Sequence, residues 1–445
     1  MKITPKRLWP ALVSVFFLLP AGVLRGAAGS AAWQAAATSP PSVGTVAPTV
    51  SPTPYDSISS PTGCVPASAQ AGSAQAPARA LRLLVDADGF FVDNEFSGPV
   101  VDGYTLPGAW VAPRLAYDPL PAIHLELGAY AAFFNGASRY PNYAYHDIAA
   151  WKGTQYQKGL HALPWFRADA RVGCLAVTIG TLHRDTCDAG GAPRQALHGL
   201  SPVLYNAEAL HSADPETGAQ LQVALPSYSL DLWIDWQSFI FRLDTHQEAF
   251  TVGLTQEVLL TRPAAPAGLR LTLPVQALFQ HRGGEIDDTG KGAQTFCNFA
   301  AGLRAGWQPR RGALTSFGGE ALALYDTQQK RGYWPWPRGW GLWLSGGVQL
   351  WERMNCRLGY FYGRDFGSIF GSPHFATLSL RTGQSYGHAH TGYYHVDYTR
   401  PFARQFALGA HFEGYLSAPG GEGLSHSFGF GLTFRASMDF LLKRL

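Results

Sequence analysis

A repeated alternation of apolar and polar residues is the feature that most restricts how this chain can fold. It recurs from Leu81 to Phe440, in segments such as AIHLELGAYAAFF, YSLDLWIDW, LRLTLPVQALFQ and FCNFAAGLRAGW. Because successive side chains of a β-strand point to opposite faces, this period of two predicts strands with one apolar face. Helical periodicity of comparable length is absent after residue 80. The alternation therefore predicts an all-β fold.

The final segment shows the pattern most clearly and reads SHSFGFGLTFRASMDF. From Phe428 to Phe440 every second residue is apolar, and the residues between them are small or polar, among them Gly429, Gly431 and Arg435. We interpret this segment as a strand with one face against lipid and the other toward a polar lumen. The residues LLKRL that follow Phe440 are not explained by this interpretation.

The segments favour a membrane barrel over a soluble sandwich or propeller, although alternation alone fits both. Their length is close to the roughly 9 to 11 residues that cross a bilayer at a tilt, whereas soluble strands average about 5 to 6. Aromatic residues gather around hairpins such as GYWPWPRGWGLW, as in the girdles of membrane barrels. An open sheet would leave unpaired edges in hydrocarbon, so the strands must close. We predict a transmembrane antiparallel β-barrel of about 14 to 16 strands.

The N-terminal part of the chain differs from the rest in composition. Residues 1–30 carry basic residues, an apolar core and small residues, the layout of a secretory signal peptide. Residues 31–80 are rich in Pro, Ser and Ala, which is typical of a disordered tail. Residues 81–120 are predicted to form either a hatch in the lumen or the first strands, and residues 121–445 the barrel. The signal and the barrel together predict a bacterial outer membrane location.

No sequence motif points to catalysis or to a cofactor. The chain contains no HExxH, P-loop or GxGxxG motif. The acidic stretch EIDDTGKG lacks the spacing of a calcium loop, and DNEF (Asp93–Phe96) is interpreted as a turn cap. We interpret His388, His390 and His395 as solvated loop histidines. The expectation is a protein that is not an enzyme and has no metal or cofactor. A formal net charge of +3 also gives no footprint for nucleic acid.

Charged residues opposite the apolar faces are the remaining functional signal. They should point into the lumen, since a charge on the lipid face costs about 2 to 4 kcal/mol at the membrane midplane. Acidic members include Asp231, Asp235, Glu257 and Glu413. The candidate ligand-binding residues are the basic members, Arg270, Arg304, Arg357, Arg381 and Arg435. A mutually neutralising network without a ligand is the alternative.

The chain has five cysteines, an odd number for an exported protein. Cys174 and Cys187 are close enough in sequence to form a disulfide across a loop, although all five could equally be unpaired.

The arrangement resembles the outer-membrane long-chain fatty-acid transporters of the FadL type, over roughly residues 81–445. The likeness lies in the export signal, the N-terminal portion before the barrel and the strand number. The resemblance implies that FFVDNEFSGPVVDGYTLPGAW, Phe90 to Trp110, forms a hatch in the lumen. It also implies transport of a hydrophobic small molecule such as a long-chain fatty acid.

Three other functions stay open. They are a general diffusion porin, a surface adhesin or antigen whose loop 184–226 binds a host-surface partner, and a secreted soluble β protein. The partners expected of a barrel are membrane lipid, the hydrophobic ligand and the barrel-assembly machinery.

Overall fold

A computed structural model describes residues 79–135, 159–184, 197–241, 246–261, 268–284, 290, 292–309, 312–329, 334–403 and 405–444. Sixteen strands make up most of this part of the chain. They are β1 (Ala80–Glu95), β2 (Tyr104–Leu120), β3 (Ile123–Phe134), β4 (Gly159–Val172), β5 (Leu175–Thr181), β6 (Thr217–Leu225), β7 (Tyr228–Ser238), β8 (Ala249–Leu259), β9 (Leu269–Arg282), β10 (Gln294–Trp307), β11 (Leu314–Gln329), β12 (Arg338–Leu350), β13 (Met354–Arg364), β14 (His388–Ala403), β15 (Phe406–Pro419) and β16 (Ser425–Arg444).

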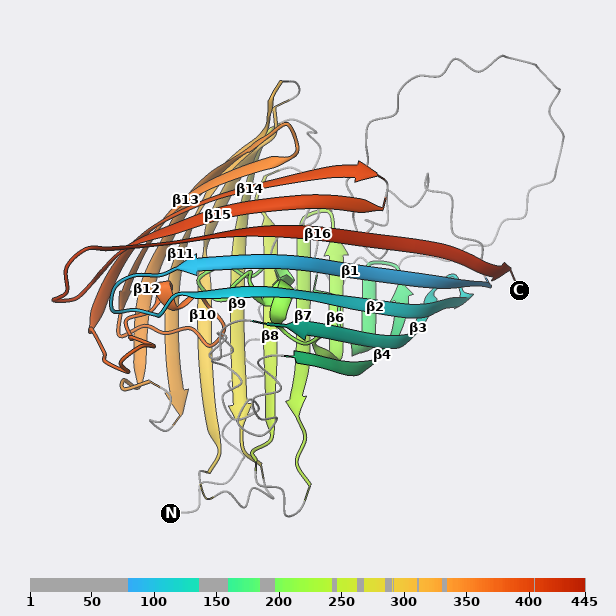
Figure 1. Cartoon of the computed structure of the whole chain (residues 1–445), viewed down its shortest axis with the longest axis horizontal. Helices are drawn as coiled ribbons and strands as arrows, with labels where there is room; N and C mark the ends of the chain where they lie inside the picture. The colour runs from blue at the N-terminus through green and yellow to red at the C-terminus, as the bar shows by residue number, and fades with distance from the viewer. Residues whose placement is uncertain are drawn as a thin grey trace. The chain divides into compact units, whose positions relative to one another are not determined.

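The strands form one closed antiparallel barrel, which confirms the predicted fold class (Figure 1). Each strand pairs with its neighbours in sequence, and β1 pairs with β16 to close the ring. The closing pair extends from Glu95 opposite Phe428 to Ala80 opposite Arg444. The residues LLKR after Phe440 therefore belong to β16 and pair with the start of β1, which explains the part of the final segment that the alternation left open.

The two ends of the barrel carry connections of different length. Short turns, such as 121–122, 173–174 and 226–227, lie at the end where β1 begins and β16 finishes. We call this the turn end. Long connections, including 182–216 and 365–387, lie at the opposite end, which we call the loop end. Outer-membrane barrels have short turns on the periplasmic side and longer loops outside.

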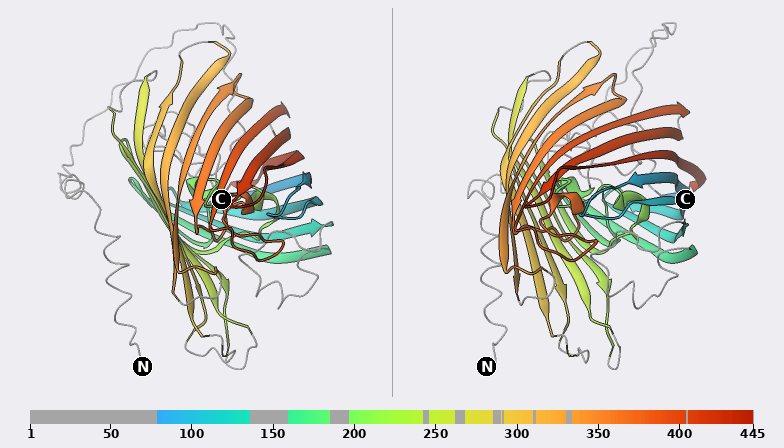
Figure 2. Two further views of the ribbon diagram at one scale, coloured as in Figure 1. Left: turned by 90° about the vertical axis from the view of Figure 1, so that its left-hand side faces the viewer. Right: turned by 60° about the vertical axis from the view of Figure 1, so that its left-hand side comes forward.

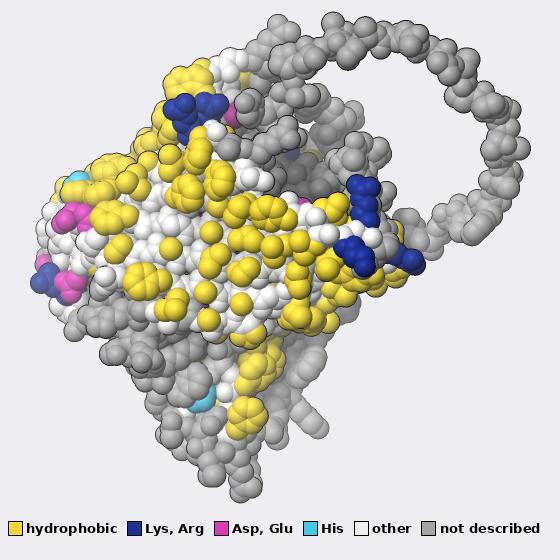
Figure 3. All heavy atoms as spheres, turned by 45° about the vertical axis from the view of Figure 1, so that its right-hand side comes forward, with side chains coloured by type: hydrophobic (Ala, Val, Ile, Leu, Met, Phe, Trp, Pro, Cys, Tyr) yellow, Lys and Arg dark blue, Asp and Glu magenta, His cyan; other side chains and the backbone are white. Residues whose placement is uncertain are grey.

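The outer face of the barrel is apolar. Outward positions of strands around the ring carry exposed large side chains, for example Leu127, Leu358 and Leu432, which are 65%, 69% and 55% exposed. Figure 3 shows a continuous apolar band on this face, with Lys and Arg side chains at its margins. In β16 the outward residues include Phe430, Leu432 and Phe434, as the alternation predicted.

Three connections from the loop end fold back inside the ring of strands. They are residues 96–103, 197–216 and 365–387, and we call them the internal layer. They contain the short helical turns η5 (Leu197–Gly199), α3 (Ala209–Ser212) and η6 (Pro373–Phe375), which lie within the wall in Figure 2. Among the described residues, no helix is long and apolar enough to cross a membrane.

Hydrogen bonds join the members of the internal layer to one another and to the wall. The amide of Asn206 donates to the Phe370 carbonyl at 2.9 Å, and the Leu380 amide donates to the Val100 carbonyl at 2.8 Å. Asn298 of β10 binds the layer through the Gly367 carbonyl at 2.7 Å. Buried apolar side chains from the layer and the wall form the main core. The layer is thus a packed part of the fold.

A buried histidine fixes the 197–216 segment to the wall. His198 contacts the Asp231 carboxylate through Nδ1 at 2.8 Å and the Glu216 carboxylate through Nε2 at 2.6 Å. Its ring stacks on Trp233 at 3.8 Å between centroids. Burial opposes the charged imidazole, but the two carboxylates outweigh it and raise the pKa of His198 to about 10. This histidine therefore acts as a charged anchor.

The hatch interpretation of Phe90 to Trp110 is wrong. These residues form the loop-end half of β1, the connection 96–103 and the start of β2, so residues 81–120 are mainly the first strands of the wall. Their period-2 alternation, in which Phe90 and Val92 face inward and Phe91 is exposed, required a wall position. The segments that enter the lumen come chiefly from later connections.

Candidate functional site

The short helix α3 faces a group of titratable side chains on the inner wall, which we call the α3 site. Its members come from β1, β2, α3 with its preceding residue, β14, β15 and β16. They are Asp88, Asn94, Tyr104, Glu208, His211, His395, His411, Glu413 and Arg435.

A carboxylate and an imidazole form the centre of the α3 site. His211 Nδ1 lies 2.8 Å from Asp88 Oδ2, and both residues are buried. Phe90 packs on the imidazole at 5.2 Å between ring centroids. Among the described residues, Nε2 of His211 has no hydrogen-bond partner. A carboxylate that holds one ring nitrogen while the other stays open is the arrangement of a general base.

A second carboxyl group precedes α3. Glu208 accepts hydrogen bonds from the Tyr104 hydroxyl and from the Asn94 amide, the latter at 3.3 Å. Burial raises the pKa of Glu208 to about 8, although both of these bonds favour the charged form. At neutral pH this carboxyl is largely protonated, so it can donate a proton.

Glycines of the final strand make room for this site. Gly431 lies opposite His411 in the β15–β16 register, and a Cβ on Gly431 would come within 2.1 Å of His411 Cε1. A Cβ on Gly429 would come within 2.2 Å of Asn94 Oδ1. The small inward residues of FGFG therefore provide space for a histidine and an amide.

His411 and His395 complete the site on the β14 and β15 side. Their rings lie 6.1 Å apart at 15°, and His395 contacts Asp397 at 3.4 Å and Glu413 at 3.6 Å. His411 has no hydrogen bond to any described residue, and it lies close enough to His211 for the two imidazoles to interact electrostatically. The α3 site thus holds a second imidazole with open ring nitrogens.

Arg435 is the cation nearest to the central pair. Its Nε lies 3.9 Å from Asp88 Oδ2, and its side chain is 54% exposed. An exposed guanidinium beside the pair can bind an anionic group of a ligand.

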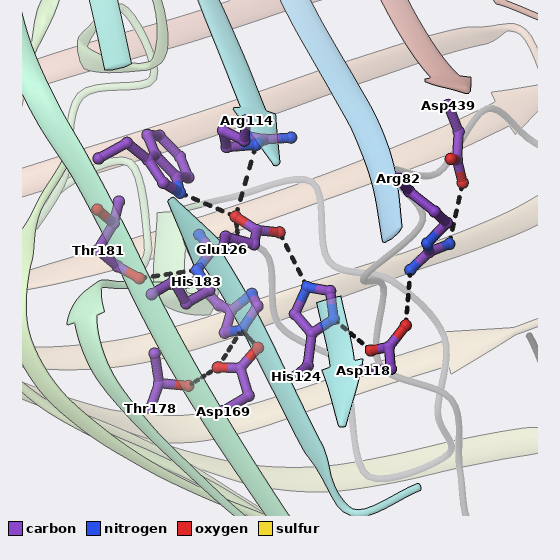
Figure 4. A network of polar contacts seen from close by, with 12 residues as sticks. Arg82, Arg114, Asp118, His124, Glu126, Asp169, Thr178, Thr181, His183 and Asp439 are labelled. Carbon is purple, nitrogen blue, oxygen red and sulfur yellow. Dashed lines mark hydrogen bonds and ion pairs between the residues drawn. The ribbon is translucent and has the colours of Figure 1, made fainter. Parts of the chain in front are cut away.

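A second polar cluster lines the inner wall across β1 to β5, and we call it the wall network (Figure 4). Glu126 is its centre. One carboxylate oxygen lies 3.1 Å from His124 Nε2, and the other accepts from Trp165 Nε1 at 2.8 Å. Arg114 and Arg167 each lie 3.5 Å from that second oxygen and stack over Trp165.

The wall network continues on both sides of Glu126. Asp118 lies 2.6 Å from His124 Nδ1 and also contacts Arg82, which in turn pairs with Asp439 of β16. On the other side, Asp169 is held by the Thr178 hydroxyl and His183. Charges of both signs are matched at close range, so we assign this cluster to wall stability.

Among the described residues, no group of three or more His, Cys, Asp and Glu side chains is placed to hold a metal ion.

Comparison with known proteins identifies the family. The model of a family described as lipid A 3'-O-deacylase-type matches residues 71–445. The chain belongs to this family. Among curated proteins, none matches the sequence.

Solved structures with a similar fold are outer-membrane proteins of very low identity. The outer membrane protein OprD from Pseudomonas aeruginosa is 11% identical, with 83% of this chain and 97% of that chain covered and a TM-score of 0.42. OccAB1 from Acinetobacter baumannii is 8% identical, with 83% and 99% covered and a TM-score of 0.45. A BenF-like porin from Pseudomonas fluorescens Pf-5 is 8% identical, with 80% and 99% covered and a TM-score of 0.44.

The family match corrects two expectations from the sequence. The family is named for a deacylase, so the expectation that the chain is not an enzyme is wrong. The barrel architecture inferred from the resemblance is present, but the FadL type itself finds no support. Sequence motifs gave no sign of the α3 site, because its residues lie far apart in the chain.

The predicted ligand-binding arginines do not form one site. Arg270, Arg304, Arg357 and Arg435 occupy inward positions of β9, β10, β13 and β16. Arg304 pairs with Glu257 and Glu320, which leaves it within a neutralising network. Arg381 lies outside the strands, in the 365–387 connection, and pairs with Asp102 at 3.1 Å. Only Arg435 lies at the α3 site, and ligand binding by any of them stays a prediction.

The structure also bears on the predicted loop histidines and on the loop 184–226. His388, His390 and His395 are not loop residues but belong to β14. Residues 197–205 of loop 184–226 are largely buried inside the barrel, and residues 217–225 form β6, so these parts offer no exposed surface to a host partner. The signal peptide, the 31–78 part of the tail and the tip of EIDDTGKG lie outside the described residues.

Cys174 is a free, exposed thiol in the turn between β4 and β5, at the opposite end of β5 from the segment that leads to Cys187. Cys187 lies outside the described residues, so its pairing stays a prediction.

The sequence carried only weak signals for the residues that matter most. Asn94 belongs to DNEF, which the sequence pattern indicated as a turn cap. His211 lies in the long connection 184–226, whose length alone indicated function. No pattern in the sequence linked either residue to Asp88.

Proposed function

We propose that this protein is a hydrolase of the bacterial outer membrane that removes an ester-linked acyl chain from a lipid A-type glycolipid. The family match supports the reaction class. The observation that carries the assignment to the α3 site is His211, with Nδ1 held by Asp88 and Nε2 open. The apolar outer face and closed barrel support the membrane location.

In the proposed reaction, His211 acts as the general base. Nε2 takes a proton from a water molecule whose oxygen attacks the ester carbonyl carbon. Asp88 stabilises the imidazolium and keeps Nδ1–H pointing away from the reacting atoms. When the tetrahedral intermediate collapses, the carbon–oxygen ester bond breaks and the proton returns to the leaving alkoxide. The products are a fatty acid and the free hydroxyl of the glycolipid.

Two neighbouring groups support this step. Protonated Glu208 can donate a hydrogen bond to the leaving oxygen, while the proton that is transferred comes from His211, because the Glu208 proton is retained at neutral pH. The half-exposed Arg435 guanidinium can stabilise the negative charge that develops on the carbonyl oxygen, or hold a phosphate of the glycolipid. Among the described residues, no Ser or Thr hydroxyl bonds to His211, so water is the favoured nucleophile.

The wall is short at β5, which suggests a route for the acyl chain. β5 has only 7 residues, and it pairs with β4 only from Arg167 to Val172. Residues 159–166 of β4 extend further toward the loop end, without a β5 partner among the described strands. Apolar side chains line the lumen between this step and His211, including Tyr130, Trp165 and Phe90. An acyl chain that enters over the short strand β5 would therefore contact apolar side chains.

Hydrolysis by purified protein tests the proposal directly. Wild-type protein is incubated with acylated lipid A in detergent, and released fatty acid is measured by mass spectrometry. We expect His211→Gln to lower the rate by about 100- to 10,000-fold, the usual contribution of a general base. The matched control is His281→Gln on the outward face of β9, where the imidazole contacts Thr295, and it should keep the wild-type rate. Equal rates in both variants would remove His211 from the reaction.

A channel is the second candidate, because the ring of 16 strands encloses a lumen lined by charged side chains. Transport of fatty acids through this lumen is the finer version of that proposal. The internal layer occupies the loop-end half of the lumen, so we expect small or no steady currents in planar bilayers. Large steady currents would favour a general porin instead.

A further inference from the structure

Basic side chains gather on the outward face at the loop end of β12, β13, β14 and β16. We call this set the outer basic rim, and its members are Arg338, Arg364, His388, His390 and His426. All five are exposed. They share the outward alternation of their strands with lipid-facing residues such as Trp340 and Leu358, which are 49% and 69% exposed. The rim is therefore separate from the lumen and from the α3 site.

Strand register places the members of the rim side by side. Arg364 lies opposite Trp340 on one neighbouring strand and opposite His388 on the other. Arg338 is two positions from Trp340 on the same face, which is within diagonal reach of Arg364. Two guanidinium groups can thus approach one ligand.

Tyrosines hold two of the histidines in place. The Tyr360 hydroxyl lies 2.7 Å from His390 Nδ1. Tyr394 crosses the face of β15, where Gly414 leaves room for its ring, and its hydroxyl lies 2.7 Å from His426 Nε2. These hydrogen bonds therefore fix the positions of His390 and His426 on the outer face.

Within the part of the chain that the structure describes, the two arginines of the rim carry charges that no carboxylate pairs with. Arg338 and Arg364 have no ion pair with any described residue. The lumen arginines Arg114, Arg167 and Arg304, by contrast, each lie within 4 Å of a carboxylate. An unpaired guanidinium on the outer face is available to an anion from outside.

We propose that the outer basic rim binds the phosphorylated sugar headgroup of a glycolipid of the outer leaflet. The rim lies at the margin of the apolar band, at the end where long loops mark the cell exterior, which is the level of outer-leaflet headgroups. Guanidinium groups bind phosphate in a bidentate manner, and Trp and Tyr side chains favour the same interfacial level. This binding does not depend on hydrolysis at the α3 site.

Binding of defined lipids tests the proposal. The full barrel in detergent is titrated with bis-phosphorylated lipid A, with its dephosphorylated form and with phosphatidylglycerol, and bound lipid is measured by native mass spectrometry. All proteins carry His211→Gln, so that the lipid is not consumed. The variant Arg338→Gln/Arg364→Gln should bind bis-phosphorylated lipid A about 25-fold more weakly, with about fivefold for each arginine.

The control is Arg400→Gln, on the outward face of β14 at the turn end, which should bind lipid A within about twofold of the parent. Heat-modifiable migration checks that each variant forms a barrel. Unchanged binding in the double variant, or equal binding of the dephosphorylated form, would overturn the proposal. Equally tight binding of phosphatidylglycerol would overturn the choice of a glycolipid. Because lipid binding is measured in the His211→Gln background and hydrolysis in the wild-type background, a failure of the rim proposal is distinguished from a failure of the reaction site.

Discussion

The wall network and the α3 site are both polar clusters on the inner face, yet they differ in how completely their groups are used. In the wall network both oxygens of Glu126 are occupied by His124, Trp165 and two arginines. In the α3 site, His411 and Nε2 of His211 have no partner among the described residues, and neither has the buried Oδ1 of Asp88. A cluster whose central carboxylate is held on both oxygens stabilises a fold, whereas an open imidazole nitrogen held in place is available for chemistry.

The two clusters also differ in how far apart their residues lie in the chain. The wall network joins positions of neighbouring strands, such as Asp118 and His124 across one hairpin. The α3 site joins Asp88 to His211 and brings both beside Arg435. Local register suffices for the first apart from the Arg82–Asp439 pair, which needs the β1–β16 closure, whereas the second also needs the internal layer to be docked.

The largest effect that separates the two regions is expected for Glu126→Ala. This change leaves Arg114 and Arg167 buried without their shared carboxylate, which should lower the free energy of unfolding by about 3 to 5 kcal/mol. Urea unfolding in lipid vesicles, followed by tryptophan fluorescence, measures the loss. The exposed Glu422→Ala should change stability by less than about 0.5 kcal/mol. Equal stability of the two variants would contradict the structural role of the wall network.

Glu208 makes the stability of the α3 site depend on pH above the ordinary carboxyl range. Because its folded pKa of about 8 exceeds the ordinary value of 4.5, the folded state binds more protons than the unfolded state between these pH values. The free energy of unfolding should therefore fall by a few kcal/mol as pH rises through this window, since each pKa unit corresponds to about 1.4 kcal/mol.

Comparing urea unfolding at pH 5 and pH 8.5 tests this expectation. In Glu208→Gln the contribution of this group disappears, so the stability curve should be flatter than that of the wild type. The same slope in both proteins would show that Glu208 ionises normally.

Asp88→Asn in the α3 site should lower the rate of hydrolysis far more than the same substitution in the wall network. The amide cannot stabilise an imidazolium at His211, so fatty acid release should fall about 100-fold while the barrel stays folded. Asp118→Asn makes the same substitution in the wall network. It should weaken the barrel, because Asp118 contacts Arg82 and His124, yet change the rate per folded molecule by less than about threefold. If both variants lost activity equally, the division between the two regions would fail.

The sequence predicted the wall far better than the site. Alternation identifies strands because each inward or outward position depends only on its neighbours two residues away, as in Phe428 to Phe440. It could not predict that His198 turns back into the lumen to meet Asp231, since this contact joins a long connection to a strand. The site remained hidden for the same reason: Asp88 and His211 carry no mutual spacing signal. The inward glycines were visible in the sequence, but not the His411 ring that occupies the space.

The smallest effect is expected at those glycines. In Gly431→Ala the new Cβ would lie 2.1 Å from His411 Cε1, so the imidazole must move away from its place opposite β16. If His411 takes part in the reaction, the rate should fall about tenfold, less than for Asp88→Asn because His411 does not contact Asp88. The matched control is Gly306→Ala on the inner face of β10, where a Cβ meets no atom within 4 Å. Equal rates in Gly431→Ala and Gly306→Ala would show that His411 does not take part in the reaction. His211 would remain the base, and His411 would belong to the structural part of the wall although its ring nitrogens are open.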